Sequence, residues 1–483
     1  MLLRISPARP AGRVAAALRC RFGGTLRVAR LSTARQRNCL SVAVKPEVTS
    51  KQVVVDAVTK ALKRSASGEY AAAVILASKS LGGWLQDATF VSQLLEPLGQ
   101  GQEAGELSVL SAAVDAIPRL SSQGVYSSSE GLAILYGGLE ETLPGLWAEG
   151  SGSSGKGSQP SLEFRVAPLQ HDQRPLQVTV PVANTIFNNG RVHTILSSRW
   201  RTAKGSAPEL LDVAERTRPV IVTDGVAAAS SSVVAPLVPV TEPRKILAGL
   251  GNILRQVEVD SLPAPASKEL EDIIPKLLKA RSRRAVGYRQ VGPMGVWALI
   301  YPQHVAASSE LPPALDLGAE DEWVPARHVS GLVSGLLAEG CHIRKILSGG
   351  GGWGLKQGLL SLDPQTKYST ADNEDVESFM RSFQGEDSGS ATVMPGSYVQ
   401  YFVEPFGSLP EGLQNKTKID GESIVLGNQG APLKEATSSN VEVQPGLFGA
   451  ASSEGIYIAS EADDQHGIIT KLDSGGSHIV SRA

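Results

Sequence analysis

A glycine-rich stretch, SGGGGWGLKQGLLSLDP at 348–364, contains residue types that could bind a phosphate. A Walker loop needs Gly-Lys-Ser or Gly-Lys-Thr, because its lysine reaches the terminal phosphates and its hydroxyl holds magnesium. Here Gly354 is followed by Leu355 and Lys356, so the lysine comes one residue late and the hydroxyl is missing. The stretch is therefore not a Walker loop.

Three of these glycines fit the spacing Gly-x-Gly-x-x-Gly, which lets a backbone approach a pyrophosphate at the start of a helix. The CHIRKIL segment before them is charged, and Asp363-Pro364 stops any following helix within about ten residues. This context argues against a dinucleotide site. Two interpretations remain, namely a tight turn covered by Trp353, or backbone N–H groups that bind an anion or carboxylate beside basic side chains.

An anion site at this turn would suit a protein that senses small ligands, and we take it as the centre of the candidate site. Asn184 belongs to an asparagine-rich turn that could line such a site, although these turns are often structural. Asn252 and Arg255 come from the segment GLGNILRQVEVD. The candidate ligand-binding residues are Arg344, Lys345, Gly349, Gly350, Gly351, Gly352, Trp353, Lys356, Asn184, Asn252 and Arg255.

Patterns typical of catalysis or metal binding are missing from the sequence. None of the seven histidines pairs with another at the spacing of a helical metal site, and EADDQH at 461–466 is more typical of an exposed acidic loop. No Gly-x-Ser-x-Gly nucleophile elbow occurs. We therefore assign no catalytic residue, no metal ligand and no cofactor, and the sequence does not support enzyme activity.

The first 46 residues predict a mitochondrial presequence. They carry nine arginines and one lysine, and the first acidic residue is Glu47. An arginine-rich, acid-free segment with spaced leucines and valines forms the kind of basic amphipathic helix that directs import. The alternative is a basic arm that binds nucleic acid. We expect cleavage near 30–32 or at 37–38, and a mature protein in the mitochondrial matrix.

Removal of this segment changes the charge of the protein. It leaves 36 basic against 48 acidic residues, a net charge of −12, which disfavours a general nucleic-acid surface. Cys20 and Cys39 fall in the expected presequence, so Cys341 alone would remain and no disulfide framework is expected. No apolar run reaches the roughly 18 residues of a membrane span, so no transmembrane segment is expected.

The apolar periodicity predicts an α/β protein of mixed α+β type, with mixed sheet layers and flanking helices. TSKQVVVDAVTKALKRS has helical spacing, whereas YAAAVILASKS and EGLAILYGG are typical of buried strands. Asn189-Gly190 predicts a hairpin turn. Two segments that begin RKIL, at 244 and 344, each predict a strand before a glycine turn. We expect one domain at 47–285 with a flexible insertion at 148–160, and a β-rich α/β domain at 286–483.

The densest basic run after the expected presequence is KLLKARSRR at 276–284. Its functional interpretation is a surface for RNA or an anionic membrane. Its structural interpretation is a helix end whose cations complement the helix dipole. The structural interpretation is favoured because no aromatic RNA-binding motif accompanies the run.

Residues 69–281 resemble the FIST sensory domain, which occurs in bacterial signalling proteins and in some eukaryotic F-box proteins. The resemblance lies in AAAVILASKS before a helix, in EGLAILYGG, in NNGRVHTILSSRW with RTRPVIVT, and in GLGNILRQVEVDSLPAPASKELEDIIPKLL. The glycine stretch and LGNILRQV also resemble an uncharacterised fungal mitochondrial family. The resemblance implies a FIST-like α/β N-terminal domain that senses small molecules such as amino acids, with no catalytic set to carry over.

These observations lead to three hypotheses of different kinds. The first is a mitochondrial small-ligand-binding protein that acts by binding rather than by catalysis. The second is an interaction factor for mitochondrial ribosomes or gene expression that uses 276–284 to contact RNA. The third is a nucleotide-dependent enzyme that uses the glycine stretch. The partners implied are a small molecule or anion in the first case and a ribosome or RNA in the second.

Overall fold

We describe the protein from a computed structural model. The residues that it describes are 38–65, 70–99, 104–120, 126–148, 159–170, 174–223, 230–284, 294–319, 321–349, 358–368, 393–407, 422–429, 440–460 and 469–482. The expected presequence up to residue 37 and almost all of the expected insertion at 148–160 lie outside these ranges.

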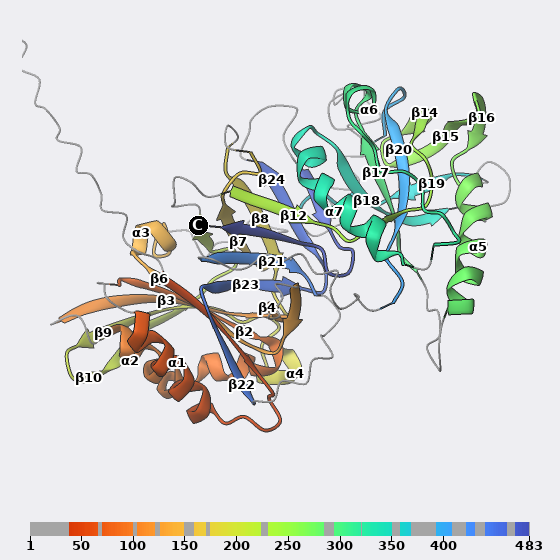
Figure 1. The fold of residues 1–483 in the computed structure, drawn as a ribbon. Helices are drawn as coiled ribbons and strands as arrows, with labels where there is room; N and C mark the ends of the chain where they lie inside the picture. Colours follow the sequence, from red (N-terminus) through yellow and green to blue (C-terminus); the bar gives the residue numbers. More distant parts are fainter. Residues whose placement is uncertain are drawn as a thin grey trace, which may run out of the picture. The chain divides into compact units, whose positions relative to one another are not determined.

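A seven-stranded sheet forms the first layer of the fold (Figure 1). Its middle strands β2 and β3 run parallel, and the other neighbouring pairs are antiparallel. In sheet order the strands are β10 (Ser206–Glu215), β9 (Ile195–Ala203), β3 (Ala104–Val114), β2 (Ala72–Ser78), β6 (Gly131–Gly137), β1 (Asn38–Val44) and β22 (Val441–Pro445).

Strand β2 is apolar on both faces, so each face must be covered. Helices cover one of them. Ile75 of β2 packs with Val58 of helix α1 (Lys51–Ser65) and Leu94 of helix α2 (Ala88–Gly99). The neighbouring residue Leu76 points the other way and packs in a different apolar cluster, as strand alternation requires. Both helices lie together on one side of the sheet in Figure 1. The short helix η1 (Lys79–Gln86) connects β2 to α2 on this side.

Two further sheets cover the opposite face. One has five strands, and Phe164 and Ile458 from it pack in the same cluster as Leu76; the other has four and contributes Phe448. The five are β11 (Val220–Val222), β7 (Ser161–Val166), β8 (Leu176–Pro181), β24 (Ile456–Ser460) and β25 (Ile469–Leu472). The four are β12 (Ser230–Val234), β26 (His478–Arg482), β21 (Ser423–Asn428) and β23 (Leu447–Ser452).

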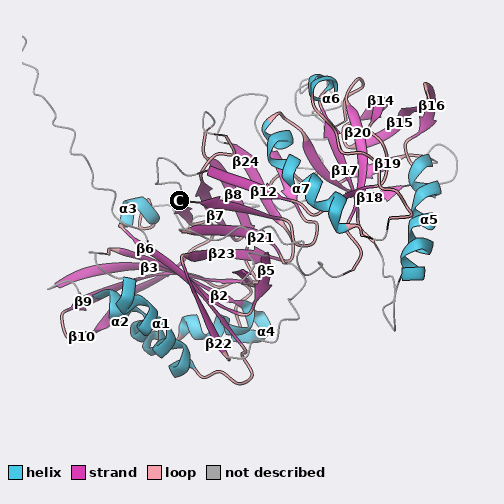
Figure 2. Cartoon of the chain, viewed as in Figure 1, coloured by secondary structure: helices cyan, strands magenta, loops and turns pink. Residues whose placement is uncertain are grey.

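Six more strands close into a barrel, because β17 pairs with β20 at the ends of the strand order (Figure 2). Around the barrel they are β20 (Tyr398–Val403), β14 (Arg244–Leu250), β15 (Ile253–Val259), β19 (Leu360–Leu362), β18 (His342–Gly349) and β17 (Val296–Tyr301). Two short strands, β13 (Val238–Pro239) and β16 (Leu262–Pro265), add to β20 and β15. The two RKIL segments are β14 and β18, so both belong to this barrel.

Alternation along β17 separates the barrel interior from its surroundings. Ala298 and Ile300 pack with residues of the other barrel strands and with Leu277 of helix α5 (Lys268–Arg284). Trp297 and Leu299 belong instead to the large cluster that includes helix α7 (Trp323–Ala338) and the five-stranded sheet. The outer face of the barrel is therefore continuous with the core of the rest of the chain.

The remaining elements are short. They are β4 (Ile117–Leu120) and β5 (Tyr126–Ser129), which pair with each other, and helices α3 (Leu139–Thr142), α4 (Ile186–Asn189) and α6 (Gln303–Ser308). None of the described helices combines the length and the hydropathy needed to cross a lipid bilayer.

The structure confirms a mixed α+β fold with helices flanking mixed sheets, and strands predominate over helices. The expected domain boundary at residue 285 stays a prediction. Strands from before and after this residue pair in the same sheets. Strand β24 pairs with β8, β26 pairs with β12, and β22 pairs with β1.

The structure bears on two further expectations. The presequence stays a prediction, but Asn38–Val44, within its expected range of 1–46, is a strand between β6 and β22, and Cys39 is buried in it. A cleaved segment that spares the fold must end before Asn38. The expected hairpin at Asn189-Gly190 is absent, since β8 and β9 lie in different sheets. Gly190 has a φ of 77° and caps helix α4, a position that favours the same residue types.

A buried histidine should make the stability of this fold depend on pH. His478 stacks on Tyr126 with 4.1 Å between ring centroids, and burial lowers the pKa of His478 to about 4. Between pH 6.5 and 4 the unfolded chain binds a proton at this residue and the folded chain does not. The unfolding free energy should therefore fall as pH drops through this window, by on the order of 3 kcal/mol from this group.

Denaturant unfolding of the parent and of His478→Phe across pH 4–7 tests this expectation. The variant keeps an aromatic ring against Tyr126 but has no proton to bind. Its unfolding free energy should therefore fall less steeply with acidification than that of the parent. Equal slopes for the two proteins would show that His478 is not the titrating group.

Candidate functional site

The structure brings charged side chains together where the barrel meets the five-stranded sheet. We call Arg344, Lys345, Asp363, Lys471 and Asp473 the charged cluster. Arg344 and Lys345 are on β18, and Asp363 follows β19. Lys471 is on β25, and Asp473 comes directly after it.

Hydrogen bonds to the backbone hold β18 and β25 beside each other. The Thr470 hydroxyl of β25 donates to the Ile343 carbonyl of β18 at 3.3 Å. The Nδ1 atom of His342 lies 3.2 Å from the Ile469 carbonyl oxygen. Burial and the nearby Arg344 guanidinium lower the pKa of His342 to about 4. These contacts hold in place the backbone of β18 and β25, which carries Arg344, Lys345 and Lys471.

Lys471 is the centre of the hydrogen-bond network. Its ammonium donates to Asp363 Oδ2 at 3.0 Å and to Gln365 Oε1 at 3.1 Å, and it lies 3.9 Å from Asp473. It also lies 5.5 Å from the centre of the Tyr457 ring, within the range of a cation–π contact. The positions of both carboxylates are thus set by one cation.

Trp297 links this network to the barrel. Its indole N–H donates to Asp473 Oδ1 at 2.7 Å. Lys345 pairs with Trp297 in the β17–β18 register, and its ammonium lies 5.6 Å from the centre of the indole ring. Lys345 therefore lies on the outer face of the barrel, on the same side as Asp473. Its neighbour Arg344 pairs with Ala298, so the Arg344 side chain leaves β18 on the interior face.

Arg344 is the member of the charged cluster whose donors are least satisfied. Only 4% of its surface is exposed, and its Nη1 donates a long hydrogen bond of 3.4 Å to the Gln365 carbonyl. Its buried Nε has no hydrogen-bond partner among the described residues. Burial lowers the pKa of Arg344 to about 10, and the Asp363 carboxylate opposes that shift. A buried guanidinium usually pairs more of its five donors than this.

A pair of tyrosines extends the site towards the carboxyl end of β3. The rings of Tyr368 and Tyr457 lie 5.7 Å apart, and Tyr368 hydrogen-bonds to Glu454. Burial, Glu454 and Asp115 together raise the pKa of Tyr368 to about 12, so its hydroxyl keeps its proton at neutral pH. Asp115 follows β3 and accepts hydrogen bonds from the backbone N–H and the hydroxyl of Ser453.

His193 lies near this end of the site. Burial lowers the pKa of His193, while the negative charge of Glu454 opposes the shift. Its buried Nδ1 has no hydrogen-bond partner among the described residues. Ligands of open α/β sheets bind outside the carboxyl ends of strands, which is where Asp115 and these neighbours lie.

The chemistry of this arrangement is suited to holding a small polar ligand. It offers fixed cations, fixed carboxylates and aromatic surface in a largely buried setting, where charge interactions are stronger than in water. Among the residues that the structure describes, no group of three or more His, Cys, Asp or Glu side chains could hold a metal ion.

The glycine part of the sequence-predicted site cannot be compared with this arrangement. Gly349 is the exposed last residue of β18, and the other five candidates lie outside the described residues. Those five are Gly350, Gly351, Gly352, Trp353 and Lys356. An anion site on the backbone of the glycine turn stays a prediction.

The other predicted residues lie in different places. The Asn252 side chain donates to the Leu362 carbonyl at 2.8 Å, so it ties the β14–β15 turn to the strand that leads into Asp363. Arg255 is exposed on β15. Asn184 accepts a hydrogen bond from the Ile186 N–H at the start of α4, and the structure does not bring it to the charged cluster.

Sequence reasoning missed the acidic members of the cluster and the tyrosines. Asp363 stands in the Asp-Pro pair at the end of the glycine stretch, where its local context indicates only the end of a helix. Lys471 and Asp473 come from a short strand with no motif. The polar–apolar–polar order of Lys471, Leu472 and Asp473 indicates a strand. It does not indicate that this strand lies beside β18.

The basic run 276–284 is partly a structural element. Arg281 is 4% exposed and donates two hydrogen bonds to the fully buried Glu322 carboxylate, at 3.2 and 2.6 Å. Arg284 donates to the same carboxylate at 2.5 Å. Lys276, Lys279 and Arg283 remain exposed on α5. A test of RNA binding must therefore change these exposed cations rather than Arg281 or Arg284.

Removal of the Glu322 carboxylate should strongly destabilise the protein. Glu322→Ala leaves Arg281 buried without its anion, which typically lowers the unfolding free energy by about 3–5 kcal/mol. Lys276→Ala, at an exposed position of the same basic run, should change it by about 0.5 kcal/mol or less. Midpoints of urea unfolding for the three proteins measure both effects, and a stable Glu322→Ala protein would contradict the structural role of the pair.

Comparison with protein-family models, with curated proteins and with solved structures found no match to this chain. The resemblance to the FIST sensory domain therefore stays a prediction. The functional argument rests on the geometry of the charged cluster.

Proposed function

We propose that this protein binds a small ligand in mitochondria, that it acts by binding rather than by catalysis, and that the charged cluster is its binding site. The observation that carries the proposal is the state of Arg344. It is a buried guanidinium whose Nε has no partner among the described residues, beside a carboxylate that is already paired with Lys471.

An anionic group on the ligand would supply what Arg344 lacks. A planar carboxylate matches two parallel N–H donors of a guanidinium, and such charge-assisted pairs are about twice as strong as neutral hydrogen bonds. Among the described residues, no hydrogen bond joins Arg344 to Asp363. Asp363 Oδ2 accepts from Lys471, and its Oδ1 accepts from the Gln365 N–H. The ligand class that we propose is therefore a small carboxylate.

The proposal of binding rather than catalysis rests on two observations. The sequence lacks a nucleophile elbow and a helical metal pattern. The charged side chains described above are mostly paired with one another, which holds them in place for recognition.

Ligand binding should appear as thermal stabilisation that depends on Arg344. A carboxylate at 100 times its dissociation constant should raise the unfolding free energy by about 2.7 kcal/mol. The protein without residues 1–37 would be screened against amino acids, simple organic acids and nucleotides by thermal unfolding. Arg344→Gln should abolish the shift caused by a binding carboxylate, because it removes the charge and the paired donors.

Arg255→Gln is the matched control, since it removes an exposed arginine from another strand of the same barrel. It should respond to the ligand as the parent does. Absence of a shift with any compound, or shifts in Arg344→Gln that equal those of the parent for every binding compound, would overturn the proposal.

The mitochondrial address is a separate part of the proposal and has its own test. Residues 1–37 carry nine arginines and no acidic residue, and the first described strand begins at Asn38. A reporter fused behind residues 1–37 should therefore enter isolated, energised mitochondria. The same fusion with the nine arginines replaced by glutamine should stay outside, because the membrane potential acts on positive charge. Exclusion of the arginine-containing fusion would contradict the address.

A further inference from the structure

A groove on the seven-stranded sheet is separate from the charged cluster. It has a volume of about 190 Å³ and lies between the η1–α2 connection and strands β9 and β10. Strand β3 contributes Ser111 to it. None of its lining residues belongs to the charged cluster or to the tyrosine pair.

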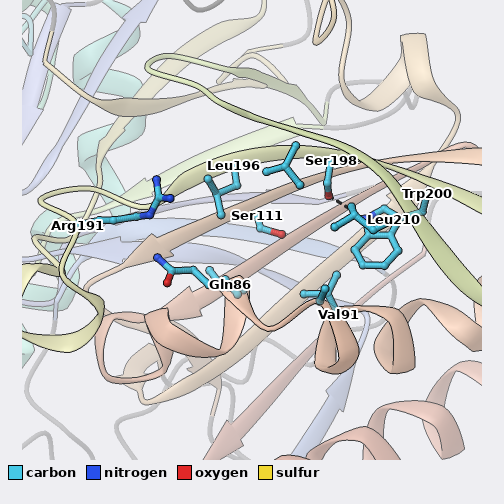
Figure 3. Close-up of a pocket in the computed structure, with 11 residues that line it drawn as sticks. Gln86, Val91, Ser111, Arg191, Leu196, Ser198, Trp200 and Leu210 are labelled. Atoms are coloured by element: carbon cyan, nitrogen blue, oxygen red, sulfur yellow. Dashed lines mark hydrogen bonds between the residues drawn. The ribbon is translucent and has the colours of Figure 1, made fainter.

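The groove is polar at one end and apolar at the other (Figure 3). Arg191 and Gln86 lie together at the polar end. Trp200, Leu210 and Val91 lie at the apolar end. A ligand that fills the groove would therefore carry a polar or charged head and an apolar tail.

Trp200 presents apolar surface to the groove because its own donor is already satisfied. Its indole N–H donates to the Ser198 hydroxyl at 2.8 Å, and the residue is only 2% exposed. Ser111 lies between the two ends of the groove and is 3% exposed.

The charge of Arg191 is available at the polar end. Arg191 forms an ion pair with Glu215, and the two side chains are 42% and 73% exposed. Exposed ion pairs of this kind are weak, so an anion that also gains apolar contacts can replace Glu215 as the partner of Arg191. The head group that complements this end of the groove is a carboxylate.

We propose that this groove binds a medium-chain carboxylate, with its head at Arg191 and its alkyl tail against Trp200, Leu210 and Val91. An apolar cavity of about 150 Å³ accommodates a benzene ring, so a groove of this size takes a tail of about six to eight carbon atoms. Tail burial supplies the driving force, and the charge of Arg191 selects the acid over neutral chains of equal length.

Octanoate is the probe for this site, and isothermal titration calorimetry is the measurement. Octanoate should bind the protein without residues 1–37, and octan-1-ol should bind about fivefold or more weakly because it lacks the charge. Arg191→Gln should weaken octanoate binding by a similar factor and leave octan-1-ol binding unchanged. Val213→Asp, which places a carboxylate at a half-exposed position of the lining, should weaken the binding of both compounds.

Two matched variants distinguish binding in this groove from binding elsewhere on the protein. Arg201→Gln removes an exposed arginine that pairs with Glu209 on the same two strands, and it should bind octanoate as the parent does. Arg344→Gln should also retain octanoate binding, since the charged cluster is a different site. Loss of binding in Arg344→Gln, equal affinity for octanoate and octan-1-ol, or no heat of binding in a folded parent protein would each overturn the proposal.

Discussion

The fold depends on covering a sheet whose central strand is apolar on both faces. Every residue of β2 is buried, and successive side chains enter two different clusters. Helices α1 and α2 cover one face with local sequence, since both lie within 30 residues of β2. The other face is covered by strands from distant parts of the chain, which brings the five-stranded sheet against it and places β25 beside the barrel.

Two buried arginines differ in how far their charges are paired with carboxylates. Arg281 faces a carboxylate that it shares with Arg284, so its burial is matched by ion pairs. Arg344 is just as buried, but the nearest carboxylate is held by Lys471 and by the backbone. Burial of a charge without full pairing is unfavourable, and proteins retain such groups where they serve a function. The contrast between the two residues distinguishes a structural cation from a candidate binding residue.

Elements that depend on a local pattern can be predicted from the sequence, whereas strands that depend on distant pairing partners cannot. The apolar patterns of helix α1 and of strands β2 and β6 predict these elements correctly. Strand β1 was missed because its neighbours in sequence are basic and suggested a targeting segment, while its partner β22 lies about 400 residues later. The predicted hairpin at Asn189-Gly190 is wrong for a similar reason. These two residues indicate only a local backbone preference, which the end of helix α4 also satisfies.

The candidate site could be predicted only where it lies on one strand. Arg344 and Lys345 are neighbours on β18, so a single segment of sequence contains both. Lys471 and Tyr457 are cross-strand partners on β25 and β24, but they reach Asp363 and β18 through side-chain contacts with residues more than 100 positions away. Periodicity within a window contains no information on such contacts. Asn252 is predicted as a ligand-binding residue from its segment alone. In the structure its side chain donates to the Leu362 carbonyl and so joins the β14–β15 turn to the strand before Asp363.

The pairing of β1 with β22 also sets the order in which the protein can fold. Synthesis delivers β1 first, whereas its outer partner follows only after residue 440. Until then the growing chain presents an open strand edge beside apolar surface, a state that favours aggregation. The same separation gives the native contacts a large average distance along the chain, which slows folding. Completion of the seven-stranded sheet must therefore wait until nearly the whole chain has been synthesised.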